Sequence, residues 1–120
     1  MAKVVHFEIP AEDPKRAVEF FSTVFGWKFN RWGENNDYYL TESGPKEEPG
    51  IEGAIMKWNH PDQPIVNTIQ VEDIESTLKL IEENGGEIVV PLQTIPGVGK
   101  HCYFKDPSGF LHGAMEPEME

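Results

Sequence analysis

The stretch His6-Phe7-Glu8-Ile9-Pro10-Ala11-Glu12-Asp13-Pro14 decides the fold, because a weakened copy of it follows sixty residues later as Val66-Asn67-Thr68-Ile69-Gln70-Val71-Glu72-Asp73-Ile74. The same shift of sixty residues places Gly26 on Gly86 and the pair Gly53-Ala54 on Gly113-Ala114. Self-similarity at a fixed spacing indicates repeated structural units. Since sixty residues are half of the chain, the sequence predicts two related modules.

The first module reads as one helix among four strands. Residues 4–9 are β-branched and aromatic, and the run stops at Pro10, which has no N–H to donate to a sheet. Asp13-Pro14 then supplies a helix N-cap followed by proline at the first helical position, and Gly26 ends the apolar residues that recur at helical spacing. Three further strands are expected at residues 27–32, 38–41 and 53–58.

The second module repeats this order after a linker rich in proline and polar residues, 59–63. Residues 65–71 are expected to form a strand, and Asp73 caps a helix that Gly85-Gly86 ends. The stretch 91–99 contains two prolines and two glycines and is expected to be a loop. The remaining strands are expected at residues 87–90, 101–105 and 110–115.

We therefore expect an α+β fold in which two βαβββ modules form curled mixed sheets around a cup. A chain of 120 residues fits one ordinary domain. The modules span residues 1–58 and 64–120 of this single domain, and residues 59–63 join them. Exposed sheet edges give such a chain a physical reason to pair, so we expect a homodimer.

Composition excludes several classes of partner. The net charge of −11 repels phosphate backbones and anionic lipid headgroups, so we expect neither nucleic acid nor membrane as a partner. No apolar run approaches the roughly 20 residues that span a bilayer. The first residues lack the pattern of a secretory signal, which makes the cytoplasm the expected compartment. Cys102 is the sole cysteine and is expected to be a buried thiol.

Along the first strand of each module, successive side chains point alternately to the two faces of the sheet. Phe7 and Ile9 are suited to lie under a helix, so His6 and Glu8 point to the opposite face. If both sheets curl, that opposite face lines a cavity between the modules, and such interfaces are common ligand sites. The residues expected to line the cavity are Thr68, Gln70, Val66, Gly53, Gly113 and Met115.

Several motifs, taken in order, resemble the glyoxalase, bleomycin-resistance and extradiol-dioxygenase superfamily, whose members are called vicinal oxygen chelate (VOC) proteins. The resemblance covers essentially the whole chain and implies the paired βαβββ fold. The motifs are His6-Phe7-Glu8-Ile9, Asp13-Pro14-Lys15-Arg16-Ala17, Phe20-Phe21, Phe25-Gly26-Trp27, Val71-Glu72-Asp73-Ile74, Asn84-Gly85-Gly86 and Phe104-Lys105-Asp106-Pro107-Ser108-Gly109.

In this superfamily, side chains from the first and last strands of each module hold a divalent metal. The resemblance places His6 at the first ligand position, and the sixty-residue spacing places the others at Gly53, Val66 and Gly113. None of those three supplies a side-chain ligand, whereas catalytic zinc normally has three protein ligands. Two alternatives therefore stay open: no cofactor, or a divalent metal that His6 binds with unconventional partners. Candidate partners are Glu8, Gln70 and Glu116.

His6 and Glu8 are also the candidate catalytic residues. A histidine titrates near neutral pH and is suited to proton transfer, and a glutamate that faces a cavity could remove a proton next to a carbonyl. The competing interpretation is structural, with each side chain hydrogen-bonded to a neighbour. His60 is expected to be exposed, and His112 to face away from the cavity, while the face of His101 stays open.

The sequence thus predicts a glyoxalase-like protein whose cavity takes a small organic molecule. The leading hypothesis, which rests on the resemblance together with His6 and Glu8, is a lyase or isomerase that acts next to a carbonyl. The alternative is a metal-free protein that binds or sequesters a small molecule, as the bleomycin-resistance branch does. The lack of side-chain ligands at Gly53, Val66 and Gly113 favours this alternative.

Overall fold

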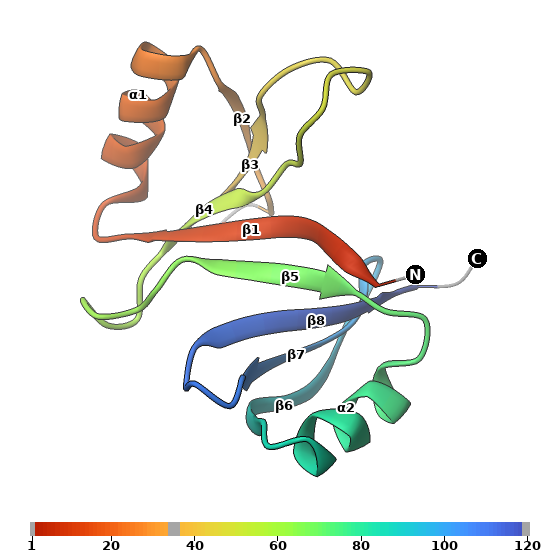
Figure 1. Ribbon diagram of the computed structural model, residues 1–120. Helices are drawn as coiled ribbons and strands as arrows, with labels where there is room; N and C mark the ends of the chain where they lie inside the picture. Colours follow the sequence, from red (N-terminus) through yellow and green to blue (C-terminus); the bar gives the residue numbers. More distant parts are fainter. Residues whose placement is uncertain (1, 34–36, 119–120) are drawn as a thin grey trace. The chain divides into compact units, whose positions relative to one another are not determined.

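The computed structural model describes residues 2–33 and 37–118. Within these residues the order of elements is βαβββ followed by βαβββ, as the internal repeat predicted (Figure 1). The α+β class and the two-module order are therefore confirmed. The elements are β1 (Lys3–Ala11), α1 (Pro14–Phe25), β2 (Lys28–Arg31), β3 (Tyr38–Glu42), β4 (Ala54–Lys57), β5 (Val66–Gln70), α2 (Ile74–Glu83), β6 (Glu87–Ile95), β7 (Gly99–Lys105) and β8 (Leu111–Pro117).

The chain divides into two compact units, which are described separately here. One unit comprises residues 6–65, and the other comprises residues 66–120 together with residues 1–5. The division after residue 65 falls close to the linker 59–63 that the sequence indicated. The assignment of the first five residues to the second unit has no counterpart in the sequence pattern.

In the unit of residues 6–65, the strand order is β2-β3-β4-β1. β1 and β4 are parallel, whereas β2, β3 and β4 are antiparallel neighbours. The helix α1 begins where Asp13 accepts hydrogen bonds from the backbone N–H groups of Lys15 and Arg16, at 3.2 and 3.4 Å. It ends at Gly26, whose φ of 73° is accessible to glycine without strain.

In the second unit, the strand order is β5-β8-β7-β6, and α2 contacts β6, β7 and β8. Its buried core contains Ile74, Cys102 and Ala114, each no more than 1% exposed. Cys102 is thus the buried thiol that the sequence indicated, and burial raises its pKa. The expected loop 91–99 is wrong in its first half, because β6 continues to Ile95 through two register shifts. β6 is the outer strand, where Pro91 removes no required sheet donor.

The internal repeat does not keep one register throughout. On the parallel strand pairs, Glu8 lies opposite Ala54, and Thr68 lies opposite Gly113. Glu8 and Thr68 are sixty residues apart, but Ala54 and Gly113 are fifty-nine residues apart. The prediction that Gly53 is the counterpart of Gly113 is therefore wrong by one residue, and Ala54 takes that place.

Gly53 instead faces the helix-covered side of its sheet. A Cβ atom at this position would clash with the carbonyl oxygen of Phe7 and lie 2.5 Å from the Phe7 ring. The Phe7 ring in turn contacts Trp27, with ring centroids 6.1 Å apart. Glycine is needed at residue 53 because the β1 backbone and Phe7 occupy the space of a side chain.

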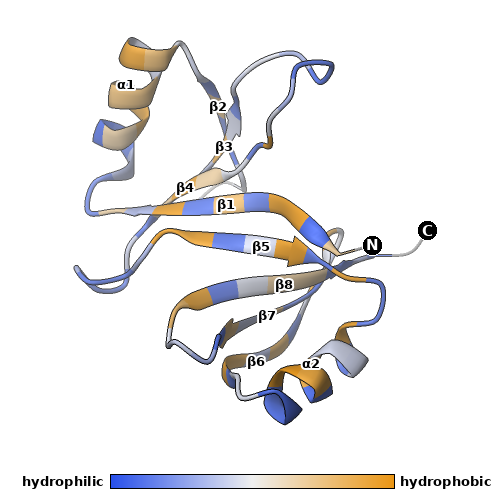
Figure 2. Ribbon diagram, in the orientation of Figure 1, coloured by the Kyte–Doolittle hydropathy of each residue, from blue (hydrophilic) through white to orange (hydrophobic). Residues whose placement is uncertain are grey.

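The described helices are too short or too polar to cross a membrane. α1 nevertheless contains several apolar residues, and Figure 2 colours the apolar parts of its ribbon orange. Phe20 and Phe25 are 56% and 60% exposed, and Val24 is 55% exposed. Several large apolar groups on one short helix are an exposed patch of the kind that often marks an interface.

Candidate functional site

Three polar side chains meet on one face of the sheet in the unit of residues 6–65. The hydroxyl of Tyr38 donates a hydrogen bond of 2.7 Å to Oε2 of Glu8. Nε2 of His6 lies 3.0 Å from the same hydroxyl oxygen. We call Glu8, Tyr38 and His6 the Glu8 site. The two residues that the sequence nominated as catalytic are thus linked through a tyrosine that it did not nominate.

The hydrogen bonds of the Glu8 site fix the positions of its protons. A tyrosine hydroxyl has one hydrogen, and in this site that hydrogen points to Glu8. The contact between His6 and Tyr38 therefore requires the hydrogen to be on Nε2 of His6. Glu8 accepts the hydrogen bond, as a carboxylate that serves as a base would do. His6 therefore donates a hydrogen bond to Tyr38, and Tyr38 donates one to Glu8.

Burial sets the charge of His6. Loss of solvent lowers its pKa from the ordinary value of 6.5, and the nearby carboxylate of Glu8 opposes this effect without reversing it. A histidine with a lowered pKa is neutral at physiological pH. Glu8 is itself only 9% exposed, and the burial of a carboxylate is tolerated where hydrogen bonds satisfy it. The Glu8 site therefore holds one acidic side chain beside a neutral imidazole.

Sheet geometry explains how residues thirty positions apart come together. Tyr38 is on β3 and Glu8 is on β1, and β4 runs between these strands. Ala54 of β4 lies directly opposite Glu8 and is completely buried. Because residues in register point to the same face, the methyl group of Ala54 leaves space above β4. Alternation along residues 38–41 could show that Tyr38 and Tyr39 point to opposite faces of the sheet. Which of the two shares the face of Glu8 depends on strand pairing that is not visible in the sequence.

The second unit carries its own set of cavity-lining candidates. Thr68 is opposite Gly113, and Gln70 is opposite Met115, so these four residues share a face. Tyr103 is in register with Gly113 on β7, which places Tyr103 and His101 on that face too. We call this the Thr68 face. It settles the open question of His101, whose ring packs edge-on against Tyr103 with centroids 4.6 Å apart.

Gly113 allows Thr68 and His101 to approach the backbone. A Cβ atom at residue 113 would lie 2.8 Å from Oγ1 of Thr68 and 3.2 Å from Nε2 of His101. Thr68 is 2% exposed, and its hydroxyl has no hydrogen-bond partner among the residues that the structure describes. A buried hydroxyl without a partner costs free energy, about 1–3 kcal/mol. The hydroxyl of Thr68 is therefore a buried polar group that no described residue satisfies.

The other sequence candidates are placed as follows. Val66 is two residues before Thr68 on β5, so it points to the same face, and it is 4% exposed. Gly53 lies on the opposite face of its sheet, as described above. The carboxylate of Glu116 accepts a 3.0 Å hydrogen bond from the backbone N–H of Ile74, at the start of α2. Glu116 thus stabilises the helix N-terminus, whereas its role as a metal partner stays a prediction.

The remaining histidines, His60 and His112, belong neither to the Glu8 site nor to the Thr68 face. Nε2 of His112 lies 2.8 Å from Oδ2 of Asp106, and its ring stacks on Phe104. This hydrogen bond is the main cause that lowers the pKa of Asp106. His60 is exposed in the linker, where its Nδ1 accepts a hydrogen bond from the backbone N–H of Asp62. As the sequence indicated, His60 is exposed and His112 points away from the Thr68 face.

The described residues do not fit the metal site that the resemblance implied. Within residues 2–33 and 37–118, no three His, Cys, Asp or Glu side chains are grouped as metal ligands would be. In the Glu8 site, Nε2 of His6 and Oε2 of Glu8 are both directed at the Tyr38 hydroxyl rather than at a shared vacant point. Two such donors fall short of the three that catalytic zinc requires.

Comparison with known proteins identifies the relatives of the chain. Residues 3–112 match the family model of the Glyoxalase/Bleomycin resistance protein/Dioxygenase superfamily. A glyoxylase-like domain-containing protein from Didymella fabae is 30% identical over 113 residues, which are 88% of this chain and 86% of that protein. A probable lactoylglutathione lyase from Vibrio cholerae is 25% identical over 119 residues, with 91% of this chain and 86% of that protein covered.

Solved structures show the same fold at lower sequence identity. Methylmalonyl-CoA epimerase from Mycobacterium tuberculosis has a TM-score of 0.72 and 13% identity, and the match covers 97% of this chain and 88% of that chain. A superfamily member from Vibrio splendidus has a TM-score of 0.71 and 17% identity, covering 98% of this chain and all of that chain.

Proposed function

The chain belongs to the Glyoxalase/Bleomycin resistance protein/Dioxygenase superfamily, and from this membership and the Glu8 site we propose that it is a lyase or isomerase that moves a proton next to a carbonyl. The observation that carries the proposal is the hydrogen bond of 2.7 Å from Tyr38 to Glu8. It holds a largely buried carboxylate in one orientation, which is what a general base requires.

In the proposed step, one oxygen of Glu8 takes the proton from the carbon next to the substrate carbonyl. The electron pair of the broken C–H bond forms a carbon–carbon double bond, and the negative charge moves to the carbonyl oxygen. Return of the proton to the opposite face of the same carbon gives an epimer. Where that carbon carries a hydroxyl group, return of the proton to the former carbonyl carbon, with loss of the hydroxyl proton, moves the carbonyl. Tyr38 orients Glu8 throughout, and neutral His6 orients Tyr38.

The relatives suggest a class of substrate. Lactoylglutathione, after which the relative from Vibrio cholerae is named, is a thioester with a hydrogen on the carbon next to its carbonyl. A thioester acidifies that hydrogen more than an ester or a carboxylate does, which makes its removal by a carboxylate base easier. We therefore infer that the substrate is a small acyl thioester substituted at the carbon next to its carbonyl.

Turnover of such thioesters, with lactoylglutathione and methylmalonyl-CoA among them, tests the proposal. Glu8→Gln keeps the size of the side chain but removes the base, so kcat should fall by about 100-fold or more. Glu12→Gln is the matched control, because Glu12 is an exposed acid at the end of the same segment. If no thioester is turned over, or if Glu8→Gln is as active as the control, the proposal fails.

A second candidate function is binding without turnover, as in a sequestering protein. The Thr68 face favours it, because Val66 and Gly113 offer no reactive group there, and Gly113 is the β8 residue opposite Thr68. Under this alternative, thioesters or other small organic molecules bind with saturation, but the wild type does not turn them over. Glu8→Gln then changes only the affinity. Binding and turnover assays on the same panel separate the two functions.

We also propose that the protein is a cytoplasmic homodimer. The apolar side chains exposed on α1, Phe20, Val24 and Phe25, support the dimer because water-exposed patches of this kind favour association. The charge of −11 supports a protein that binds neither nucleic acid nor anionic membranes. Light scattering during size-exclusion chromatography checks the dimer, and a monomeric mass at all concentrations would contradict it.

A further inference from the structure

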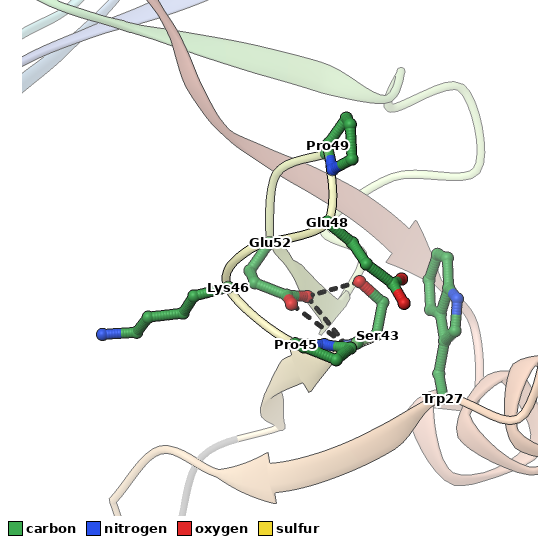
Figure 3. Close-up of a pocket in the computed structure, with 9 residues that line it drawn as sticks. Trp27, Ser43, Pro45, Lys46, Glu48, Pro49 and Glu52 are labelled. Atoms are coloured by element: carbon green, nitrogen blue, oxygen red, sulfur yellow. Dashed lines mark hydrogen bonds between the residues drawn. The ribbon is translucent and has the colours of Figure 1, made fainter.

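A pocket lies beside the loop that connects β3 to β4, in the unit of residues 6–65 (Figure 3). Its volume is about 510 Å³, which is within the range of small-molecule sites. The pocket is not part of the Glu8 site, and no role has been assigned to it so far. It is lined by Trp27, Ser43, Gly44, Pro45, Lys46, Glu48, Pro49, Gly50 and Glu52.

Hydrogen bonds join the two ends of the loop between β3 and β4. The carboxylate of Glu52 accepts from the hydroxyl of Thr41 at 2.6 Å and from the backbone N–H and hydroxyl of Ser43 at 3.1 and 2.9 Å. The backbone N–H of Glu48 donates to the carbonyl of Pro45 at 3.1 Å. With both ends of the loop tied together, the pocket loses little conformational entropy when a ligand binds.

The charge inside the pocket is negative. Burial raises the pKa of Glu52, but the hydrogen bonds from Thr41 and Ser43 outweigh it, so the pKa lies below the ordinary value of 4.5. Figure 3 shows the carboxylate of Glu48 directed toward Trp27, whereas Lys46 extends away from the other lining side chains. Two carboxylates therefore face the pocket, and the neighbouring cation does not neutralise them there.

Trp27 forms an aromatic wall of the pocket, and other aromatic rings hold its indole in place. Its indole stacks on Phe21 with ring centroids 5.0 Å apart and an angle of 13° between the planes. It also contacts Phe25 and Phe29 at 6.1 and 6.3 Å. An indole held in this way presents a π-surface without loss of rotamer freedom, and tryptophan is the side chain that binds cations best through its ring.

We propose that this loop pocket binds a small organic cation, an alkylammonium group, between the indole of Trp27 and the carboxylate of Glu48. A fixed aromatic wall, a nearby carboxylate and a volume suited to an organic group are the features that recognise quaternary ammonium ligands. The two carboxylates disfavour an anionic ligand. Trp27 contacts Phe7, and Phe7 points to the face opposite Glu8. The site is therefore separate from the Glu8 site, and it does not depend on the proposed function.

Choline and 3,3-dimethylbutan-1-ol are a suitable pair of probes, because they have the same shape and differ in the positive charge. Titration of the full-length chain is followed by the NMR shifts of the Trp27 indole N–H and of the amides of residues 43–52. We expect saturable binding of choline, with an affinity about 3- to 30-fold higher than that of the neutral alcohol.

Variants locate the binding. Glu48→Gln should weaken choline binding by about threefold or more, and Trp27→Phe should weaken it by about twofold or more. Glu47→Gln is the matched control, since Glu47 is an exposed neighbour that does not line the pocket but loses the same charge. Its effect should be smaller than about twofold.

Three results would overturn the proposal. The first is the absence of saturable shifts in residues 43–52, and the second is equal binding of choline and its neutral analogue. The third is an equal loss of affinity in Glu47→Gln and Glu48→Gln, which would show attraction to a diffuse acidic surface. Thioester turnover in the same Glu48→Gln variant should be unchanged, so this test is independent of the one for the Glu8 site.

Discussion

Tyr38 donates its hydroxyl hydrogen to Oε2 of Glu8 at 2.7 Å although the two residues are on β3 and β1, with β4 between them. On β4, Ala54 is opposite Glu8 and Met56 is opposite Tyr38, and the small side chain of Ala54 leaves space beside Glu8. The hydrogen bond links a carboxylate that could act as a base to a phenol that orients it. The proposed function depends on this pair.

Tyr38→Phe tests the contribution of the hydroxyl. The variant leaves the buried carboxylate of Glu8 with one donor fewer, so thioester turnover should fall by about 10- to 100-fold, and the free energy of unfolding by about 1–3 kcal/mol. Tyr39→Phe is the control, because the next side chain on β3 points to the other face. Steady-state kinetics and urea denaturation measure both effects, and equal behaviour of the two variants would show that the Tyr38 hydroxyl is unimportant.

The lowered pKa of His6 predicts a dependence of stability on pH. The folded chain binds a proton at His6 less readily than the unfolded chain, whose histidine has a pKa near 6.5. The contribution of neutral His6 is therefore complete above about pH 6.5, and it is lost as the pH falls through the lower, folded pKa. Urea denaturation at about pH 7.5 and about pH 5.5 should show a larger acid-induced loss for the wild type than for His6→Gln. A larger loss in the variant would contradict the assignment.

The hydroxyl of Thr68 should be dispensable for stability. Thr68→Val keeps the shape of the side chain and removes a buried group without a partner among the described residues, so the free energy of unfolding should rise by about 1 kcal/mol. Thr77→Val is the matched control, because the hydroxyl of Thr77 donates to the carbonyl of Asp73 at 2.9 Å. Thermal denaturation compares the two, and a Thr68→Val variant that is clearly less stable than the wild type would mean that the hydroxyl is paired.

Gly53 and Gly44 should differ sharply in their tolerance of alanine. A methyl group at residue 53 would meet the backbone and ring of Phe7, so Gly53→Ala should lower the free energy of unfolding by about 2–4 kcal/mol. A methyl group at residue 44 would meet only the movable carboxylate of Glu48, at 3.1 Å, and should cost less than about 1 kcal/mol. Urea denaturation checks the difference. Wild-type stability of Gly53→Ala would disprove the placement of residue 53 against Phe7.

The order of elements could be predicted because its signals are local. Asp13 with Pro14 begins one helix and Asp73 begins the other, and both capping side chains make the expected backbone contacts. Alternation also placed Glu8 and His6 on one face, since a strand has a period of two residues. The continuation of β6 to Ile95 was missed, because proline on an outer strand does not end pairing.

The partner of Glu8 could not be predicted in the same way. Tyr38 reaches Glu8 only because β3, β4 and β1 pair in one particular register, and that register depends on contacts between distant residues. The same dependence explains the error at Gly53, where a slip of one residue exchanges the two faces of a strand. The hydrogen bond from the backbone N–H of Ile74 to the carboxylate of Glu116 was not predicted either, because it joins a strand to the start of a distant helix.

Exchange of deuterium into the substrate is the most direct test of the central claim that Glu8 moves a proton next to a carbonyl. Lactoylglutathione and methylmalonyl-CoA are incubated with the protein in D₂O, and the proton NMR signal at the carbon next to the thioester carbonyl is followed. We expect the wild type and Glu12→Gln to exchange deuterium into this position, and Glu8→Gln to do so about 100-fold more slowly or not at all. Exchange by Glu8→Gln at the wild-type rate, or no exchange above the background without protein, would contradict it.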